Sequence, residues 1–558
     1  MSLRVRRMRA VALAVGLGVP AGVWGQGAAS PNGAAPTRPG TAGQSTPSQG
    51  TPQTGATPPG TTSQGAPQTG AMPPGTTPPV LQSGQTTIVV EPSLTKEQEK
   101  QLLNEADEIF RFVSRDTGLP IAHPVKKVFI TRDKVNAELR KKFDEDKSNK
   151  RMERSELVLK KFGLLDRDFH LRPFLLSLLT EQIAGFYDNK TKTMNLLDWV
   201  PIEQQKPVMA HELTHALQDQ KVGLTKWGDQ EPDGMAKNSN EDTEHIRTDE
   251  TDTAREAVLE GQAMVSFADF LLRPSGKTLK DVPQVGEQLE SGAGDMSDSP
   301  VLARAPLVLQ ESLLFPYTAG LKFEQAVLVK AGVDKAFSGM LAMPPNTSAE
   351  ILHPDQYMAQ TPEPLLLLPD IHPVLESAGY APYDVGVMGE LDVRMTAELF
   401  GGKPLAEALA PAWNGGVYYA AQRKSATAAE KETTASIAIL YLSRWKNGDS
   451  ARSFFHVFEE QLPRQYAGLT RRKEAETGED ERVFSSKEGD VLLSVKGDQV
   501  WVSEGFELKT ANKLREMVGS AQGTGPVRQA WMSAPTADLI GGIVREVGGF
   551  GVVKAVLP

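Results

Sequence analysis

No segment of this 558-residue chain limits its possible structure more than the pentapeptide His211-Glu212-Leu213-Thr214-His215. On a helix, side chains four residues apart lie on one face, so both imidazoles can bind one metal ion while Glu212 lies beside it. The flanking run from Val208 to Leu217 carries no charge other than Glu212, which predicts a buried helix. Pro207 precedes this run and suits a first helical turn. The alternative is an amphipathic helix whose two histidines are merely buried and hydrogen-bonded.

A third ligand must come from elsewhere, because a catalytic zinc ion is held by three protein ligands and keeps one position open. The chain lacks the further histidine of the HExxHxxGxxH pattern, since residues 218–220 contain none. A carboxylate on a second helix is then the best candidate. Residues 254–272 predict such a helix, and Glu260 falls on its apolar face, where a carboxylate is costly unless it is paired or bound to metal. Glu256, one turn earlier, is the competing third ligand.

With the segment Glu260-Gly261-Gln262-Ala263, the chain resembles the gluzincin branch of zinc metallopeptidases, of the exported bacterial type. In gluzincins, a glutamate in a helical Glu-Gly-x-Ala type segment joins the two histidines as the third ligand. The resemblance extends over residues 93–357 and implies one Zn2+ ion held by His211, His215 and Glu260. It also implies an α+β fold with a zincin-like domain over residues 93–381. In that domain a small sheet lies beside the zinc helix, and a mainly helical second part supplies the third ligand.

The chemistry expected of such a site is hydrolysis of peptide bonds by a zinc-activated water, with Glu212 as the general base. The expected protein is a secreted zinc endopeptidase that acts on protein or peptide substrates. The alternative is a noncatalytic zincin-like binding or assembly factor of the cell envelope. Glu212 argues against that alternative, because a structural zinc site needs no general base. Hydrolysis of a non-peptide amide would use the same residues.

Two further features bear on the cleft. Residues 182–197 predict two short strands that turn at residues 188–190. In gluzincins a sheet edge before the zinc helix binds the substrate as an added strand; this hairpin has the corresponding place, but a plain core hairpin is an equal alternative. Tyr317 and His353 lie in segments that resemble those downstream of the third ligand in secreted gluzincin-type proteins. Either could donate a hydrogen bond to the oxyanion, and a structural hydrogen bond is the alternative role for each.

Between the two predicted helices, residues 229–252 are polar and strongly acidic. Charge runs usually remain in water, so we expect a solvated insertion. A loop over the cleft or a cation site is the alternative. The acidic residues closest together are Glu241, Asp242, Glu244, Asp249, Glu250 and Asp252.

The N-terminal segment is typical of an exported protein. Arginines followed by an apolar run from Ala10 to Trp24 predict a signal peptide over residues 1–26, because the run is too short for a comfortable membrane span. An uncleaved anchor is the alternative. Residues 27–92, rich in Gly, Pro, Thr, Ser and Gln and containing a repeated fifteen-residue motif, predict a disordered tether. We therefore expect a periplasmic or extracellular protein with no transmembrane segment after signal cleavage.

Composition narrows the partners and the metal chemistry. The net charge of −10, with no basic stripe, argues against nucleic acid and anionic membranes as main partners. The absence of cysteine excludes thiolate ligands and disulfides. Residues 382–558 predict a C-terminal α+β region whose role, like the oligomeric state, the sequence leaves open. The further elements that we expect are helices over residues 93–117, 430–445 and 511–518, a strand over residues 125–131, and a hairpin over residues 490–503.

Overall fold

The computed structural model describes residues 94–143, 146–183, 185–228, 232, 234–293, 299–362 and 364–522. This part of the chain combines many helices with two separate sheets, which is consistent with the predicted α+β class. The expected signal peptide and tether, residues 1–92, lie outside the described residues. None of the described helices combines the length and the apolar character that a membrane span requires.

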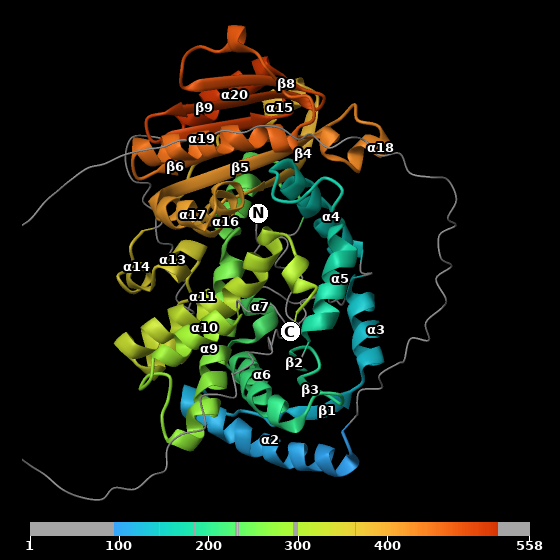
Figure 1. Ribbon diagram of the computed structural model, residues 1–558, viewed down its shortest axis with the longest axis vertical. Coiled ribbons are helices and arrows are strands. Elements are labelled where there is room, and N and C mark those ends of the chain that lie inside the picture. The colour runs from blue at the N-terminus through green and yellow to red at the C-terminus, as the bar shows by residue number, and fades with distance from the viewer. Residues whose placement is uncertain are drawn as a thin grey trace, which may run out of the picture. The chain divides into compact units, whose positions relative to one another are not determined.

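The chain up to residue 379 is mainly helical (Figure 1). Its α-helices are α2 (Lys96–Thr117), α3 (Arg132–Phe143), α4 (Asp146–Lys161), α5 (Leu171–Gln182), α6 (Ile202–Val222), α7 (Leu224–Trp227), α8 (Ser239–Thr248), α9 (Thr251–Leu272), α10 (Gln284–Ala293), α11 (Leu307–Ala331), α12 (Met340–Ala342), α13 (Ser348–Leu352), α14 (Pro354–Met358) and α15 (His372–Ser377). Short helical turns are η1 (Arg273–Ser275), η2 (Leu302–Arg304) and the π-helical turn η3 (Lys335–Gly339). The predicted helices at 93–117 and 254–272 are confirmed by α2 and α9.

A three-stranded sheet lies beside α6 in the lower part of the view (Figure 1). Its strands are β1 (Lys126–Ile130), β2 (Gly185–Asp188) and β3 (Thr193–Leu197), in the order β1-β3-β2. The central strand β3 is parallel to β1 and antiparallel to β2. The side chain of Asp188 accepts hydrogen bonds from the backbone N–H groups of Lys190 and Thr191, which stabilises the tight turn. The predicted strand and the predicted hairpin are therefore confirmed.

The helix that carries the pentapeptide starts earlier than expected. α6 begins at Ile202, so Pro207 lies inside the helix and not in its first turn. Pro207 has no N–H to donate, so the helix lacks one backbone hydrogen bond. Because this position is near the start of the helix, the loss disrupts few turns. The amide of Gln205 donates to the carbonyls of Leu197 and Val200, and these bonds attach the extra turns to β3.

Helices α9 and α11 approach each other closely at two glycines, Gly261 and Gly320. A Cβ atom at Gly261 would lie 2.5 Å from the carbonyl carbon of Gly320 and would overlap its oxygen. A Cβ atom at Gly320 would in turn overlap the carbonyl oxygen of Ala257. The two helices therefore contact each other backbone to backbone, which places α11 against the part of α9 that carries Glu260.

The C-terminal region contains a seven-stranded antiparallel sheet in the order β4-β5-β6-β10-β9-β8-β7. Its strands are β4 (Tyr380–Gly386), β5 (Trp413–Arg423), β6 (Ile437–Trp445), β7 (Thr470–Arg471), β8 (Glu481–Ser486), β9 (Gly489–Lys496) and β10 (Gln499–Glu504). Its helices and helical turns are α16 (Glu390–Gly401), α17 (Lys403–Leu409), η4 (Ala410–Ala412), α18 (Ala428–Lys431), η5 (Thr434–Ser436), α19 (Gly448–Gln465), η6 (Lys473–Ala475) and α20 (Leu508–Ser520). The expected boundary between residues 381 and 382 falls inside β4, and all described residues belong to one compact unit.

One element of this region was predicted wrongly. The expected helix at 430–445 is mostly the strand β6, which is almost entirely buried in the middle of the sheet. A continuous apolar run fits a strand covered on both faces as well as a buried helix, and the sheet decides between them. The hairpin at 490–503 is confirmed by β9 and β10, and the helix at 511–518 by α20.

The acidic stretch 229–252 is not simply a solvated insertion. Asp242, Asp249, Glu250 and Asp252 are all buried. Oδ2 of Asp249 accepts a hydrogen bond of 2.7 Å from the N–H of Val387, and Oδ2 of Asp242 lies 2.8 Å from Nε2 of His372. These carboxylates are bonded to groups near the start of the large sheet, which compensates for the loss of water. The expectation was wrong because a charge run reveals nothing about the partners that tertiary structure supplies.

Candidate metal centre

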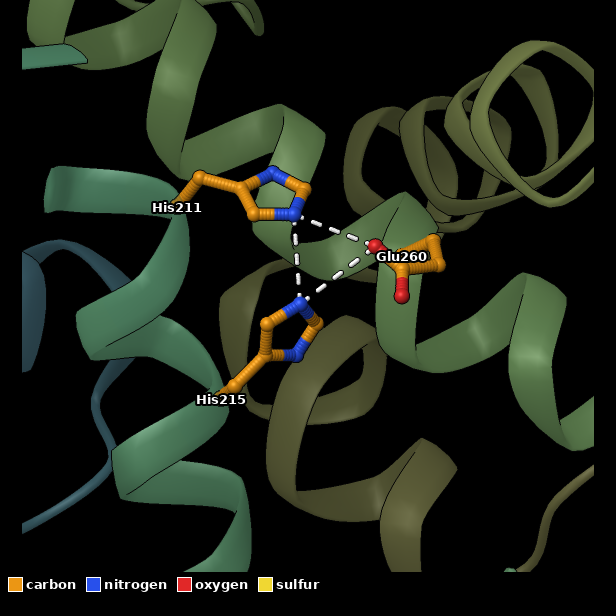
Figure 2. Close-up of side chains that lie close together, drawn as sticks. All are labelled: His211, His215 and Glu260. Atoms are coloured by element: carbon orange, nitrogen blue, oxygen red, sulfur yellow. Dashed lines mark hydrogen bonds and ion pairs between the residues drawn. The ribbon is translucent and has the colours of Figure 1, made fainter. Parts of the chain in front are cut away.

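The three predicted metal ligands lie on helices that pack side by side, α6 and α9. His211 and His215 are one turn apart on α6, and Glu260 extends towards both from α9 (Figure 2). Each of the three residues is at most 4% exposed. In the part of the chain that the structure describes, these residues form the one group of three side chains spaced to hold a metal ion. Glu256 is buried on α9 but does not belong to that group.

The three ligand atoms converge on one point between the helices. Nε2 of His211 is 3.1 Å from Nε2 of His215 and 3.1 Å from Oε2 of Glu260, and the remaining distance, from His215 to Glu260, is 3.3 Å. A tetrahedral zinc ion with bonds of about 2.0–2.1 Å separates its ligand atoms by about 3.3 Å. Imidazole nitrogens also suit zinc far better than they suit Ca2+ or Mg2+. The residues present therefore fit one zinc ion in spacing and in chemistry.

Burial and mutual contact set the charges in this group. Burial raises the pKa of Glu260, but the two histidines outweigh it and hold that pKa well below its usual range. Burial lowers the pKa of His215, but the carboxylate of Glu260 outweighs it and raises the pKa of His215 to about 9. The buried carboxylate thus requires a positive charge beside it. A proton on His215 or a metal ion between the ligands can supply that charge.

Glu212 has one carboxylate oxygen held in place and one free. Its Oε2 accepts a hydrogen bond of 2.7 Å from the backbone N–H of Tyr187, whereas its Oε1 has no hydrogen-bond partner among the described residues. Burial raises the pKa of this carboxyl above its ordinary value, although the neighbouring histidines oppose the shift. An oriented carboxylate with a free oxygen and a raised pKa is suited to accept a proton and pass it on.

The β2–β3 hairpin is attached to α6 beside Glu212. In addition to its backbone bond to Glu212, Tyr187 donates its hydroxyl to Oδ2 of Asp219 over 2.8 Å. β2 is an edge strand of its sheet, because among the described residues it pairs with β3 alone. The structure therefore places the edge strand next to the predicted general base.

The two candidate oxyanion donors occupy different places. The ring of Tyr317, on α11, stacks on the ring of His211, with centroids 6.2 Å apart and planes 17° apart. His353 lies between α13 and α14, and its Nε2 is 2.9 Å from both carboxylate oxygens of Glu390 on α16. Tyr317 is thus beside the metal group, whereas His353 bonds to a carboxylate of the C-terminal region.

Sequence reasoning missed two glutamines: Gln218, which contacts the group through His215, and Gln262, which contacts Gln218. Both are fully buried, although glutamine is mostly exposed in proteins. The available signals were spacing alone: Gln218 lies three residues after His215 on one helix face, and Gln262 lies two residues after Glu260 in an apolar helix.

Comparisons with known proteins give no match: no protein-family model, no curated protein and no solved structure matches the chain. These comparisons therefore do not bear on the reaction. What the chain itself offers is the group of His211, His215 and Glu260, with Glu212 beside it.

Proposed function

We propose that this chain is an exported zinc endopeptidase of gluzincin type, with a zincin-like domain over residues 93–381. The observation that carries the proposal is the convergence of His211, His215 and Glu260 on one point. Beside them, on the same helix as the histidines, Glu212 has a carboxylate oxygen with no hydrogen-bond partner among the described residues. A purely structural zinc site is closed and needs no base, whereas hydrolysis needs a group that accepts a proton. The substrates proposed are proteins or peptides, in the periplasm or outside the cell.

The mechanism follows from what each side chain can do. His211, His215 and Glu260 would hold the zinc ion. When bound there, zinc would supply Lewis-acid chemistry, which makes water a nucleophile near neutral pH. Oε1 of Glu212 accepts the proton from the attacking water, while the N–H of Tyr187 holds Oε2 in place. Glu212 then gives that proton to the amine as the C–N bond breaks.

Substrate binding is proposed at the outer edge of β2, where a peptide would pair as an added strand through backbone groups other than the N–H of Tyr187, which holds Glu212. Specificity would then depend on pockets for alternate side chains. Tyr317 is the favoured oxyanion donor, because its ring stacks beside that of His211 with the centroids 6.2 Å apart. The net charge of −10 fits peptide substrates better than nucleic acid or anionic membranes.

Zinc content and chelator-reversible hydrolysis of a mixed peptide substrate test the proposal. Wild type should bind one zinc ion per chain and cleave peptides. Glu212→Gln should keep its zinc and lose turnover by a factor on the order of 100 to 10,000, the range expected for loss of a general base. Retained peptidase activity in this variant would exclude the mechanism.

Glu256 supplies the matched control, because it is a buried glutamate one turn from Glu260 on the same helix. Glu256→Gln should keep both zinc and activity, and Glu256→Ala should keep zinc where Glu260→Ala loses it. Loss of zinc in the Glu256 variants alone would show that Glu256, and not Glu260, is the third ligand. Bound zinc with no cleavage of any peptide would favour the noncatalytic binding or assembly factor.

A further inference from the structure

A chain of buried amide side chains leads away from His215 on the side opposite the metal group. Nδ1 of His215 is 2.8 Å from Oε1 of Gln218, and Nε2 of Gln218 is 2.9 Å from Oε1 of Gln262. Neither glutamine is exposed, so water does not compete for these bonds. The chain links α6 to α9 and ends at η3, where Nε2 of Gln262 contacts the carbonyls of Ala336 and Phe337 at 2.8 and 3.2 Å.

The backbone carbonyls determine which way each amide points. A carbonyl oxygen only accepts hydrogen bonds, so the end of Gln262 that faces Ala336 and Phe337 must be its NH2 group. Its oxygen therefore faces Gln218. The same reasoning holds for Gln218, whose Nε2 also lies 3.0 Å from the carbonyl of Leu259. Reversing either amide would place oxygen against carbonyl oxygen and leave a buried donor unpaired.

This orientation determines which nitrogen of His215 carries hydrogen. Because the oxygen of Gln218 faces Nδ1, that nitrogen must be the donor. In the neutral imidazole the lone pair is then on Nε2, the atom that lies 3.1 Å from His211 and 3.3 Å from Glu260. The tautomer that leaves Nε2 free for a metal ion is thus selected by the carbonyl of Leu259 on α9 and by two carbonyls of the π-helical turn η3, through two glutamines. Such turns are frequent at functional sites.

We propose that Gln218 and Gln262 are positioning residues that hold His215 with hydrogen on Nδ1 and Nε2 free for the metal ion. This inference rests on the metal-binding part of the proposed function and not on peptide hydrolysis. Partners of metal-bound histidines of this kind typically contribute about 10- to 100-fold in metal affinity. Gln218 is expected to contribute more than Gln262, because it touches the imidazole directly and retains its bond to Leu259 when Gln262 is changed.

Zinc dissociation constants, measured by competition with a chelator of known affinity, test the proposal in the full chain. Gln218→Met removes the acceptor at nearly constant volume and should weaken zinc binding by about 10- to 100-fold. Gln262→Met should weaken it less. Gln218→Glu keeps an oxygen facing Nδ1 and should bind zinc more tightly than Gln218→Met, but more weakly than wild type, because its second oxygen faces the carbonyl of Leu259.

Gln205 offers the matched control on the same helix as Gln218. It is 1% exposed and donates through Nε2 to two backbone carbonyls, but it does not contact His215 or Gln262 through any of these bonds. Gln205→Met should therefore lower the free energy of unfolding about as much as Gln218→Met does, while zinc affinity stays at the wild-type value. Unfolding curves of the metal-free variants provide that comparison.

The outcomes separate this proposal from the broader one. If Gln218→Met and Gln205→Met bind zinc equally well, the positioning role is overturned even though the zinc site stands. If the zinc affinities differ as expected but no peptide is cleaved, the positioning role stands and the peptidase does not. If wild type binds no zinc, both proposals are overturned.

Discussion

Replacing Gly261 with alanine tests whether the close contact of α9 and α11 holds the metal group together. The added Cβ would lie 2.5 Å from the carbonyl carbon of Gly320 and overlap its oxygen, whereas carbon atoms in contact prefer about 3.5–4.0 Å. The helices must therefore separate by about 1 Å. Overpacking of this kind typically lowers stability by about 1–3 kcal/mol, and contact with rigid backbone favours the upper end. Alanine stabilises a helix by about 1 kcal/mol relative to glycine, so the free energy of unfolding should fall by about 2 kcal/mol in total.

Urea unfolding of the metal-free protein and zinc titration are the two assays for Gly261→Ala. Zinc affinity should also fall, because metal bonds tolerate displacements of only about 0.2 Å and Glu260 is the preceding residue. The control is Gly519→Ala near the end of α20, where a Cβ meets nothing within 4 Å and the same substitution should be neutral or stabilising. If Gly261→Ala were as stable as wild type and bound zinc equally well, the close contact would not support the site.

Two more predictions concern buried acids and the hairpin. Burial raises the pKa of Glu250 to about 7, although bonds from Ser348 oppose the shift; the folded protein therefore binds this proton more tightly than the unfolded chain. The contribution of Glu250 to stability should fall as pH rises from about 4.5 to about 7. Glu250→Gln should remove that loss when the free energies of urea unfolding at pH 5 and pH 8 are compared. The same difference between the two pH values in wild type and variant would contradict this. Tyr187→Phe removes the hydroxyl bond to the buried carboxylate of Asp219 and should lower the free energy of unfolding by about 1–3 kcal/mol. It should also slow turnover at constant zinc content if the hydroxyl bond fixes the backbone N–H that holds Glu212, and a variant with wild-type turnover would show that this N–H is held without the hydroxyl.

The metal candidates could be predicted because their signals are local or periodic. The spacing of His211 and His215 places both on one helix face, and the apolar stripe around Glu260 marks a carboxylate that must find a cation. The structure brings these three residues together. The edge strand β2 was predictable for the same reason, since a hairpin carries its turn residues and its alternation in the sequence.

Other features depend on partners that are distant in the sequence. Strand β6 was taken for a helix because a continuous apolar run is ambiguous until the neighbouring strands are known. Asp249 and Glu250 were expected in water, yet they bond to Val387 and Ser348, more than ninety residues away. Gln218 carries no charge and follows no motif, so only its contact with His215 reveals it.

Anomalous diffraction from crystals grown with zinc is the most direct test of the central claim. The account predicts one strong peak at the zinc edge, about 2.0–2.2 Å from Nε2 of His211, Nε2 of His215 and Oε2 of Glu260. Glu260→Ala should weaken or abolish that peak, whereas Glu256→Ala should leave it in place. A peak bound by Glu256, or no peak between α6 and α9 in crystals of wild type, would contradict the claim.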